Sequence, residues 1–138
     1  MFNASALRRY PSMALAGSVV VLFSIWAGTK AFNAAQQQRQ TARLMTQGDA
    51  SKAPASLRRF GCSGCHEIAG ISGADGKIGG SLSDIRKRVY VGGVLNNTSD
   101  NLVKWIVSPQ TFSPRTAMPV TGISEAEARD VAAYLYSN

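Results

Sequence analysis

Apolar residues are distributed unevenly along the chain, and the longest apolar run lies near its start. Residues 10–29 (YPSMALAGSVVVLFSIWAGT) form twenty consecutive positions without a charge. As a helix this segment would be about 30 Å long, which matches the hydrocarbon core of a bilayer. The charged and aromatic residues at its ends are Arg8, Arg9, Tyr10, Trp26 and Lys30. The pattern predicts an N-terminal transmembrane anchor over residues 1–30.

A cleaved signal peptide is the alternative, because it has the same order of basic, apolar and small residues. Cuts after Ala27 or Ala34 would leave the bulky Ile25 or Phe32 where a small residue is preferred, and a cut after Ala31 fits only moderately. The sequence therefore favours an anchor. Basic residues before the span predict a cytoplasmic N-terminus. We expect a single-pass protein of the bacterial inner (cytoplasmic) membrane, with the rest of the chain on the periplasmic side.

The segment after the span is polar but rich in helix-forming residues. Residues 31–53 (AFNAAQQQRQTARLMTQGDASKA) are dominated by Ala, Gln and Arg, so the helix is predicted to continue to about Met45. Gly48 and Asp49 then indicate a stop, followed by a short hinge. Because a polar helix has no packing face of its own, a solvated connector is favoured over a docking element.

The net charge of +7 is concentrated around the apolar segment. Residues 1–53 contain six basic residues against one acidic residue, whereas residues 54–138 contain nine against seven. This distribution indicates membrane electrostatics and argues against nucleic-acid binding. A domain of about 85 residues is marginally stable unless something large and apolar fills its centre.

The most distinctive chemistry lies in Cys62-Ser63-Gly64-Cys65-His66, a C-x-x-C-H motif that is the attachment signature of c-type haem. Two thiols three positions apart lie on one helical turn, and the adjacent imidazole then faces the iron. A zinc site would need four ligands, yet the chain has no other cysteine or histidine. A thioredoxin-type pair would need βαβ surroundings, and a disulfide here would close too short a loop to stabilise much. We predict one covalently attached haem c, held by Cys62 and Cys65, with His66 as an iron ligand.

The second axial ligand is assigned by elimination to Met118. The other methionines are Met1, Met13 and Met45, which lie in or near the span and in the connector. Met118 lies in the loop TAMPVTG, where simple loop packing is the alternative role. A His/Met pair fills both axial positions and leaves none for a substrate, so an electron carrier is predicted rather than an enzyme. A haem-based ligand sensor would require Met118 to dissociate readily.

These residues resemble class I cytochrome c domains, over about residues 54–138. The resemblance implies an all-α small cytochrome c fold, with roughly three or four helices around one haem, here carrying an N-terminal transmembrane helix. It implies helices at Pro54–Cys65, Leu102–Val107 and Glu125–Tyr136. Ser124 and Glu127 are spaced as a capping box for the last of these. The family's Tyr-Leu pair in that helix is matched by Tyr134-Leu135.

The resemblance also suggests residues that support the haem without being its thioether or axial ligands. The family usually has a proline in the loop after the motif, where a backbone carbonyl accepts from the proximal histidine. Residues 79–82 (GGSL) stand there, and one of their carbonyls is expected to accept from His66. The family's propionates are often held by Arg, Tyr or Trp, which points to Arg88, Tyr90 and Trp105 as further cofactor-binding residues. Core packing is the alternative for Trp105.

The pattern at residues 101–119 is similar to cytochrome c domains fused to, or working beside, haem-copper oxidases. The sequence thus predicts an anchor (1–30), a connector (31–53) and a cytochrome c domain (54–138) that transfers single electrons. The expected redox partners are a donor dehydrogenase or quinol-oxidising complex and an acceptor such as a terminal oxidase. The alternative is a fixed haem c subunit of a membrane oxidoreductase complex. Its support is that Ala14, Gly17 and Ser18 share one helix face, which allows close packing between membrane helices.

Overall fold

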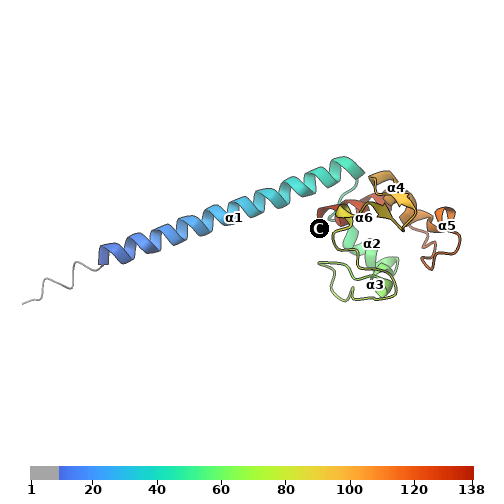
Figure 1. The fold of residues 1–138 in the computed structure, drawn as a ribbon, viewed down its shortest axis with the longest axis horizontal. Coiled ribbons are helices and arrows are strands. Elements are labelled where there is room, and N and C mark those ends of the chain that lie inside the picture. Colours follow the sequence, from blue (N-terminus) through green and yellow to red (C-terminus); the bar gives the residue numbers. More distant parts are fainter. Residues whose placement is uncertain (1–9) are drawn as a thin grey trace, which may run out of the picture. The chain divides into compact units, whose positions relative to one another are not determined.

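The computed structural model describes residues 10–138, with side chains from residue 16 onward. Arg8 and Arg9 therefore lie outside the described residues, as do the side chains of Tyr10, Met13 and Ala14. The described chain is mostly helical (Figure 1), as the sequence predicted. In chain order its elements are α1 (Tyr10–Thr46), α2 (Ala53–Arg59), α3 (Cys62–Cys65), the 3-10 helix η1 (Ile85–Lys87), β1 (Tyr90–Val91), β2 (Leu95–Asn96), α4 (Ser99–Val107), α5 (Pro109–Phe112) and α6 (Glu125–Ser137).

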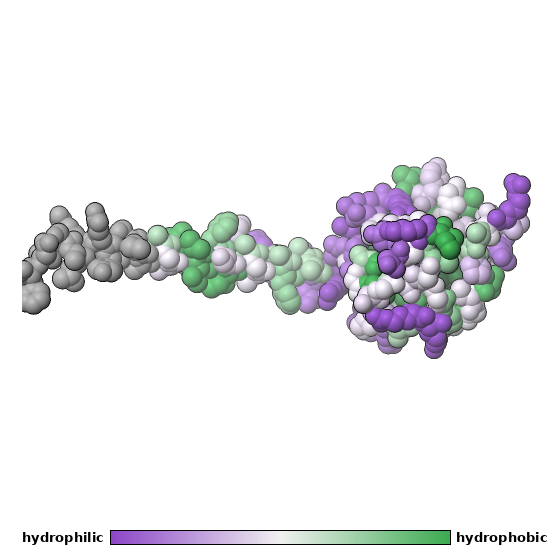
Figure 2. All heavy atoms as spheres, turned by 90° about the horizontal axis from the view of Figure 1, so that it is seen from below, coloured by the Kyte–Doolittle hydropathy of each residue, from purple (hydrophilic) through white to green (hydrophobic). Residues whose placement is uncertain are grey.

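The chain divides into two compact units, one ending at Gln36 and one spanning Gln37–Asn138. In the first unit the apolar side chains of α1 are exposed along the helix (Figure 2), and Leu22 and Phe23 are each 65% exposed. Among the described residues, one helix is long and apolar enough to cross a membrane, within Ala16–Thr46. A signal sequence would meet the same criterion, so the structure leaves the anchor and the signal peptide both open.

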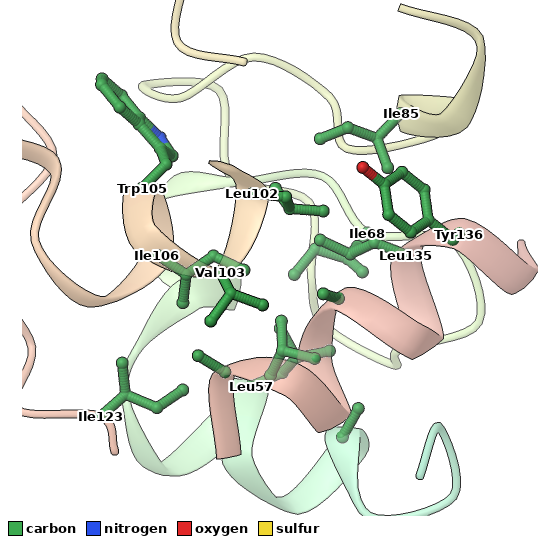
Figure 3. Packing of buried hydrophobic residues seen from close by; sticks show 14 of the residues in the cluster. Leu57, Ile68, Ile85, Leu102, Val103, Trp105, Ile106, Ile123, Leu135 and Tyr136 are labelled. Atoms are coloured by element: carbon green, nitrogen blue, oxygen red, sulfur yellow. The ribbon is translucent and has the colours of Figure 1, made fainter. Parts of the chain in front are cut away.

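The second unit is built around α6, which packs against both α2 and α4. Leu57 on α2 and Ala128 and Ala132 on α6 are completely buried, because the small alanines let the two helices approach closely. Figure 3 shows the side chains of α4 and α6 meeting in the same core. The larger members of this core are Leu57, Ile68, Ile71, Ile85, Val91, Leu102, Val103, Trp105, Ile106, Ile123, Val131, Leu135 and Tyr136.

Two helices differ from the sequence expectation. The helix expected over Pro54–Cys65 is divided, because Gly61 adopts a left-handed conformation (φ 72°) between α2 and α3. Pro109 ends α4 as expected, but it also begins the short helix α5, since a proline's fixed φ suits a first helical turn. The β1–β2 ribbon, in which Tyr90 pairs with Asn96, was not predicted at all.

The capping box predicted for α6 is confirmed. The Ser124 hydroxyl accepts from the Glu127 backbone N–H at 3.4 Å, and the Glu127 carboxylate accepts from the Ser124 backbone N–H at 3.1 Å. Glu127 also forms an ion pair with Arg59 at the end of α2. The start of α6 is thereby fixed both locally and against the helix that leads to the C-x-x-C-H motif.

The end of α1 is tied to α6. The helix ends at Thr46, close to the predicted Met45, and Thr46 is completely buried. The Arg129 guanidinium donates to the Thr46 carbonyl at 3.1 Å, and the Asp49 backbone N–H donates to the Asp130 carboxylate at 2.6 Å. The last part of the predicted connector therefore packs on the cytochrome unit rather than lying free in solvent.

Gly48 allows this contact, so replacing it should weaken the junction. A Cβ at Gly48 would lie 2.1 Å from the Arg129 carbonyl oxygen, far inside contact distance. We expect Gly48→Ala to destabilise the haem-loaded chain in detergent by about 1–3 kcal/mol, or roughly 5–20 °C in Tm. Gly28→Ala is the control, because its Cβ would meet nothing within 4 Å. Equal Tm values for the two variants would contradict the packing described here.

Candidate haem-binding site

The two cysteines lie on a single helical turn and the histidine follows it directly. Helix α3 spans Cys62–Cys65, and the chain leaves it in an extended conformation at His66, whose N–H donates to the Cys62 carbonyl at 2.9 Å. Both cysteines are free thiols and partly buried. Burial raises the pKa of the Cys62 thiol, so this thiol is protonated at neutral pH. The motif is thus a pair of unbridged thiols beside one imidazole.

The imidazole of His66 is held by the loop that follows the motif. Its Nδ1 lies 2.7 Å from the Gly80 carbonyl oxygen, which confirms the predicted carbonyl acceptor. Because a carbonyl only accepts, Nδ1 carries the proton and Nε2 keeps its lone pair for a metal. The Gly79 backbone N–H also donates to the Cys65 carbonyl at 2.7 Å, which binds the loop to the motif itself.

One cavity of about 380 Å³ brings together every site residue that the sequence predicted. Met118 reaches it from the loop before α6, and Trp105 from α4. Arg88 reaches it from the segment that follows η1, and Tyr90 from the start of β1. The predicted residues that line it are Cys62, Cys65, His66, Arg88, Tyr90, Trp105 and Met118. Residues separated by more than fifty positions in the sequence therefore share one site.

The rest of the cavity wall is mainly apolar. Helices α2, α4 and α6 contribute Leu57, Leu102, Ile106, Val131 and Leu135. The loops and the η1 turn also contribute residues that the sequence analysis did not select, among them Ile78, Ile85 and Gly92. The structure explains why residue 92 is a glycine: its φ is +58°, and a Cβ there would lie 2.4 Å from the Trp105 ring. Such a wall suits a large, flat, apolar group.

The three residues that were predicted to hold the haem propionates differ in how exposed their side chains are. Trp105 is 9% exposed and belongs to the core, so it both packs and lines the cavity. Tyr90 is 55% exposed. The Arg88 guanidinium donates to the carbonyls of Ser81 and Ser83, the latter at 3.4 Å. Arg88 thus brings a positive charge to the cavity. Within the described residues it forms no ion pair, although the pKa of the Asp84 carboxyl is lowered by Lys87 first and by the Arg88 charge among the further causes.

The donor set fits haem c better than it fits a bare metal ion. Two thiols, an imidazole oriented by a carbonyl and a thioether face a common apolar cavity. Within residues 16–138, no group of three or more His, Cys, Asp or Glu side chains is placed to hold a metal ion. A second cavity, of about 440 Å³, lies by Arg129 and its ion-pair partners Glu125 and Asp100 and contains none of the predicted site residues.

The chain belongs to the cytochrome c family, whose model matches residues 50–138. Membership implies covalently bound haem c, as the motif predicted, and members of the family are typically electron carriers. The chain is also similar to the cytochrome c oxidase subunit 2 of Alkalihalophilus pseudofirmus, with 32% identity over 77 residues, or 55% of this chain. The matched region spans only 22% of that longer protein. No solved structure matches the chain.

Gly79 should be sensitive to substitution because it touches the His66 ring. A Cβ at Gly79 would lie 2.3 Å from His66 Cε1, whereas one at Gly80 would meet nothing within 4 Å. We expect Gly79→Ala to displace the imidazole and lower both haem retention and the midpoint potential, while Gly80→Ala leaves them unchanged. Haem staining of denaturing gels and redox titration measure the two effects. Similar behaviour of the two variants would contradict the placement of the ring.

Proposed function

We propose that this chain is a membrane-anchored electron carrier in which Cys62 and Cys65 hold haem c through thioether bonds. His66 and Met118 are the axial ligands, and Arg88, Tyr90 and Trp105 interact with the propionates. The observation that carries the proposal is the single cavity lined by all seven side chains. When bound, the haem supplies a one-electron iron couple, and a His/Met pair gives that couple a high potential.

The protein's own groups prepare this site in three ways. The Gly80 carbonyl keeps the proton on Nδ1 of His66, so that Nε2 is the atom that faces a metal. The walls from α2, α4 and α6 exclude water, which favours the less charged, reduced state. The backbone N–H of Met118 donates to the Thr116 hydroxyl at 3.3 Å, which orders the loop that presents the thioether.

The mouth of the cavity is a suitable place for electron entry and exit. Ile78 lines the cavity and is 82% exposed, and Val120, between the lining residues Pro119 and Thr121, is 55% exposed. Arg86 and Lys87 are exposed on the nearby η1 turn. An apolar rim beside basic residues suits brief docking with an acidic redox partner, because charge steers the encounter without requiring tight binding.

We further propose that the helix of the first unit anchors the chain in the cytoplasmic membrane, with the haem domain on the periplasmic side. An anchor would keep the carrier near a donor dehydrogenase or quinol-oxidising complex and an acceptor oxidase, at a raised effective concentration. The proposed division is an anchor at residues 1–30, a connector at 31–53 and the cytochrome domain at 54–138. The burial of Ala42 and Thr46 supports a connector whose last part packs with that domain.

The second candidate is a fixed haem c subunit of a membrane oxidase or oxidoreductase complex. It is favoured by the similarity to cytochrome c oxidase subunit 2, which is named as part of an oxidase. In this case the exposed apolar face of α1 would pack against other membrane helices instead of lipid.

Mild solubilisation of native membranes separates the two candidates. The extract is fractionated by size, and covalent haem and this polypeptide are followed together by haem staining and an antibody. A carrier migrates as one protomer with its micelle, whereas a subunit migrates with a large assembly whose companion chains identify the reaction. A polypeptide without covalent haem in every fraction would overturn the proposed function.

A further inference from the structure

Asn97 makes three hydrogen bonds with its single amide group. Its Nδ2 donates to the Ile85 carbonyl at 2.7 Å and to the Arg88 carbonyl at 2.8 Å. Its Oδ1 accepts from the Tyr136 hydroxyl at 2.7 Å. The opposite orientation would place the amide oxygen against two carbonyl oxygens, so the partners themselves fix which end is Nδ2. The Asn97 side chain therefore has a defined orientation that depends on its neighbours.

The two carbonyls that Asn97 holds lie at the two ends of the η1 turn. The Arg88 backbone N–H closes this turn by donating to the Ile85 carbonyl at 3.1 Å. The Asn97 backbone N–H adds a further hydrogen bond to this segment by donating to the Val89 carbonyl at 2.9 Å. Ile85 itself is 4% exposed and packs in the core. The segment that carries Arg88 into the cavity is thus fixed by the core on one side and by Asn97 along its backbone.

Tyr136 supports Asn97 from the last turn of α6. It is 7% exposed, and its hydroxyl points toward the turn that carries Ile85 (Figure 3). Burial raises the pKa of this phenol to about 12, so it stays neutral and remains a donor over the physiological range. Tyr136 does not line the cavity, whereas Arg88 does. A chain of hydrogen bonds therefore runs from Tyr136, outside the cavity lining, to the backbone of Arg88, which lines it.

We propose that Tyr136 and Asn97 are positioning residues that hold the Arg88 guanidinium at the haem cavity and thereby raise the midpoint potential of the site. The inference rests on the function proposed above. A fixed positive charge near the iron favours the reduced state over the oxidised state, because the charge attracts the added electron. It has the same effect if it neutralises a propionate carboxylate, whose negative charge would favour the oxidised state. Arg88 is exposed, and its guanidinium donates to the Ser81 and Ser83 carbonyls, so its distance from the cavity depends on where its backbone is held. When the backbone is released, the charge moves farther from the cavity and is screened more fully, so the midpoint potential falls.

A double-mutant cycle tests this inference on the full haem-loaded chain in detergent. Tyr136→Phe removes the hydroxyl and keeps the ring, and Arg88→Gln removes the charge. We expect each variant to lower the midpoint potential at neutral pH. The double variant should have the same potential as Arg88→Gln alone, because Tyr136 acts through Arg88. If the role of Tyr136 were purely structural, Tyr136→Phe would lower Tm, but its effect on the midpoint potential would not depend on whether Arg88 is present.

Tyr134→Phe is the matched control, since Tyr134 lies on the same helix and its hydroxyl donates to the Ala69 carbonyl at 2.7 Å. The Tyr134→Phe variant should have a lower Tm but the same midpoint potential as the unmodified chain. Asn97→Ala should repeat the effect of Tyr136→Phe, again only when Arg88 is present. The inference is overturned if Tyr136→Phe leaves the potential unchanged, or lowers it equally in the Arg88→Gln background. Failure of the proposed function is distinct, because the unmodified chain would then carry no covalent haem to titrate.

Discussion

Replacing Cys62 and Cys65 together by serine is expected to abolish covalent haem and to leave a chain that does not keep its fold. Serine has nearly the shape of cysteine, but it cannot form a thioether. The effect on folding follows from the architecture, because the helices α2, α4 and α6 each turn apolar side chains toward the cavity as well as toward one another. A chain that has lost the group in that cavity loses contacts on all three helices at once.

The size of the cavity sets the scale of this loss. At about 24 cal/mol per Å³ of cavity, a dry space of 380 Å³ would cost about 9 kcal/mol. Water entering through the open mouth reduces this figure. It is nevertheless comparable to the whole stability of an ordinary small domain, which is about 5–15 kcal/mol. We therefore expect loss of the helical circular dichroism that α2, α4 and α6 contribute at room temperature, with the signal of α1 retained, and rapid proteolysis of residues 54–138.

Haem staining after denaturing electrophoresis measures attachment, and circular dichroism measures folding. Ser63→Ala is the control, because it lies inside the motif and carries neither thiol. Each single cysteine variant retains one possible thioether and should give an intermediate level of staining. Full staining of the double variant would show that the haem is attached elsewhere, and a folded double variant without haem would show that the apolar core is sufficient on its own.

Features that depend on neighbouring residues were predictable from the sequence. The C-x-x-C-H motif occupies one turn, so its geometry hardly depends on the rest of the chain. The capping box of Ser124 and Glu127 is equally local. Val131 and Leu135 of α6 lie one helical turn apart, as an apolar helix face requires, and both are in the core. In these cases short-range geometry fixes the outcome before any tertiary contact forms.

Features that depend on distant partners were not predictable. The contact between Asp49 and Asp130 joins residues 81 positions apart, and nothing near Asp49 in the sequence indicates that its backbone is bonded. Asn97 looks like an ordinary turn residue until Tyr136, 39 positions away, is placed beside it. The roles of Gly48 and Gly79 are also invisible in isolation, because each is required by what approaches it. The sequence marks the candidate ligands, but most of the contacts that hold the surrounding segments in place become visible only in the structure.

Replacing Met118 by leucine should lower the midpoint potential by on the order of a hundred millivolts or more. Leucine keeps the apolar volume, so the fold should be retained at a cost below about 1.5 kcal/mol. The thioether, however, is lost, and with it the proposed axial ligand, which would stabilise the reduced iron. The Met118 side chain is partly buried against the core, so a substituted leucine has a place to pack. Redox titration of the haem-loaded chain measures the shift.

Met45→Leu is the matched control, because Met45 lies on α1, is 53% exposed and does not line the cavity. It should leave the potential unchanged. Met118→Leu should also gain the ability to bind carbon monoxide or cyanide, since it opens one axial position. An unchanged potential without new ligand binding would exclude Met118 as a ligand. If the unmodified chain already bound carbon monoxide readily, its sixth ligand would be labile and a sensor would be favoured over a carrier. A shift confined to the Met118 variant instead ties the high potential to this sulfur atom, because the chain has no second histidine to replace it.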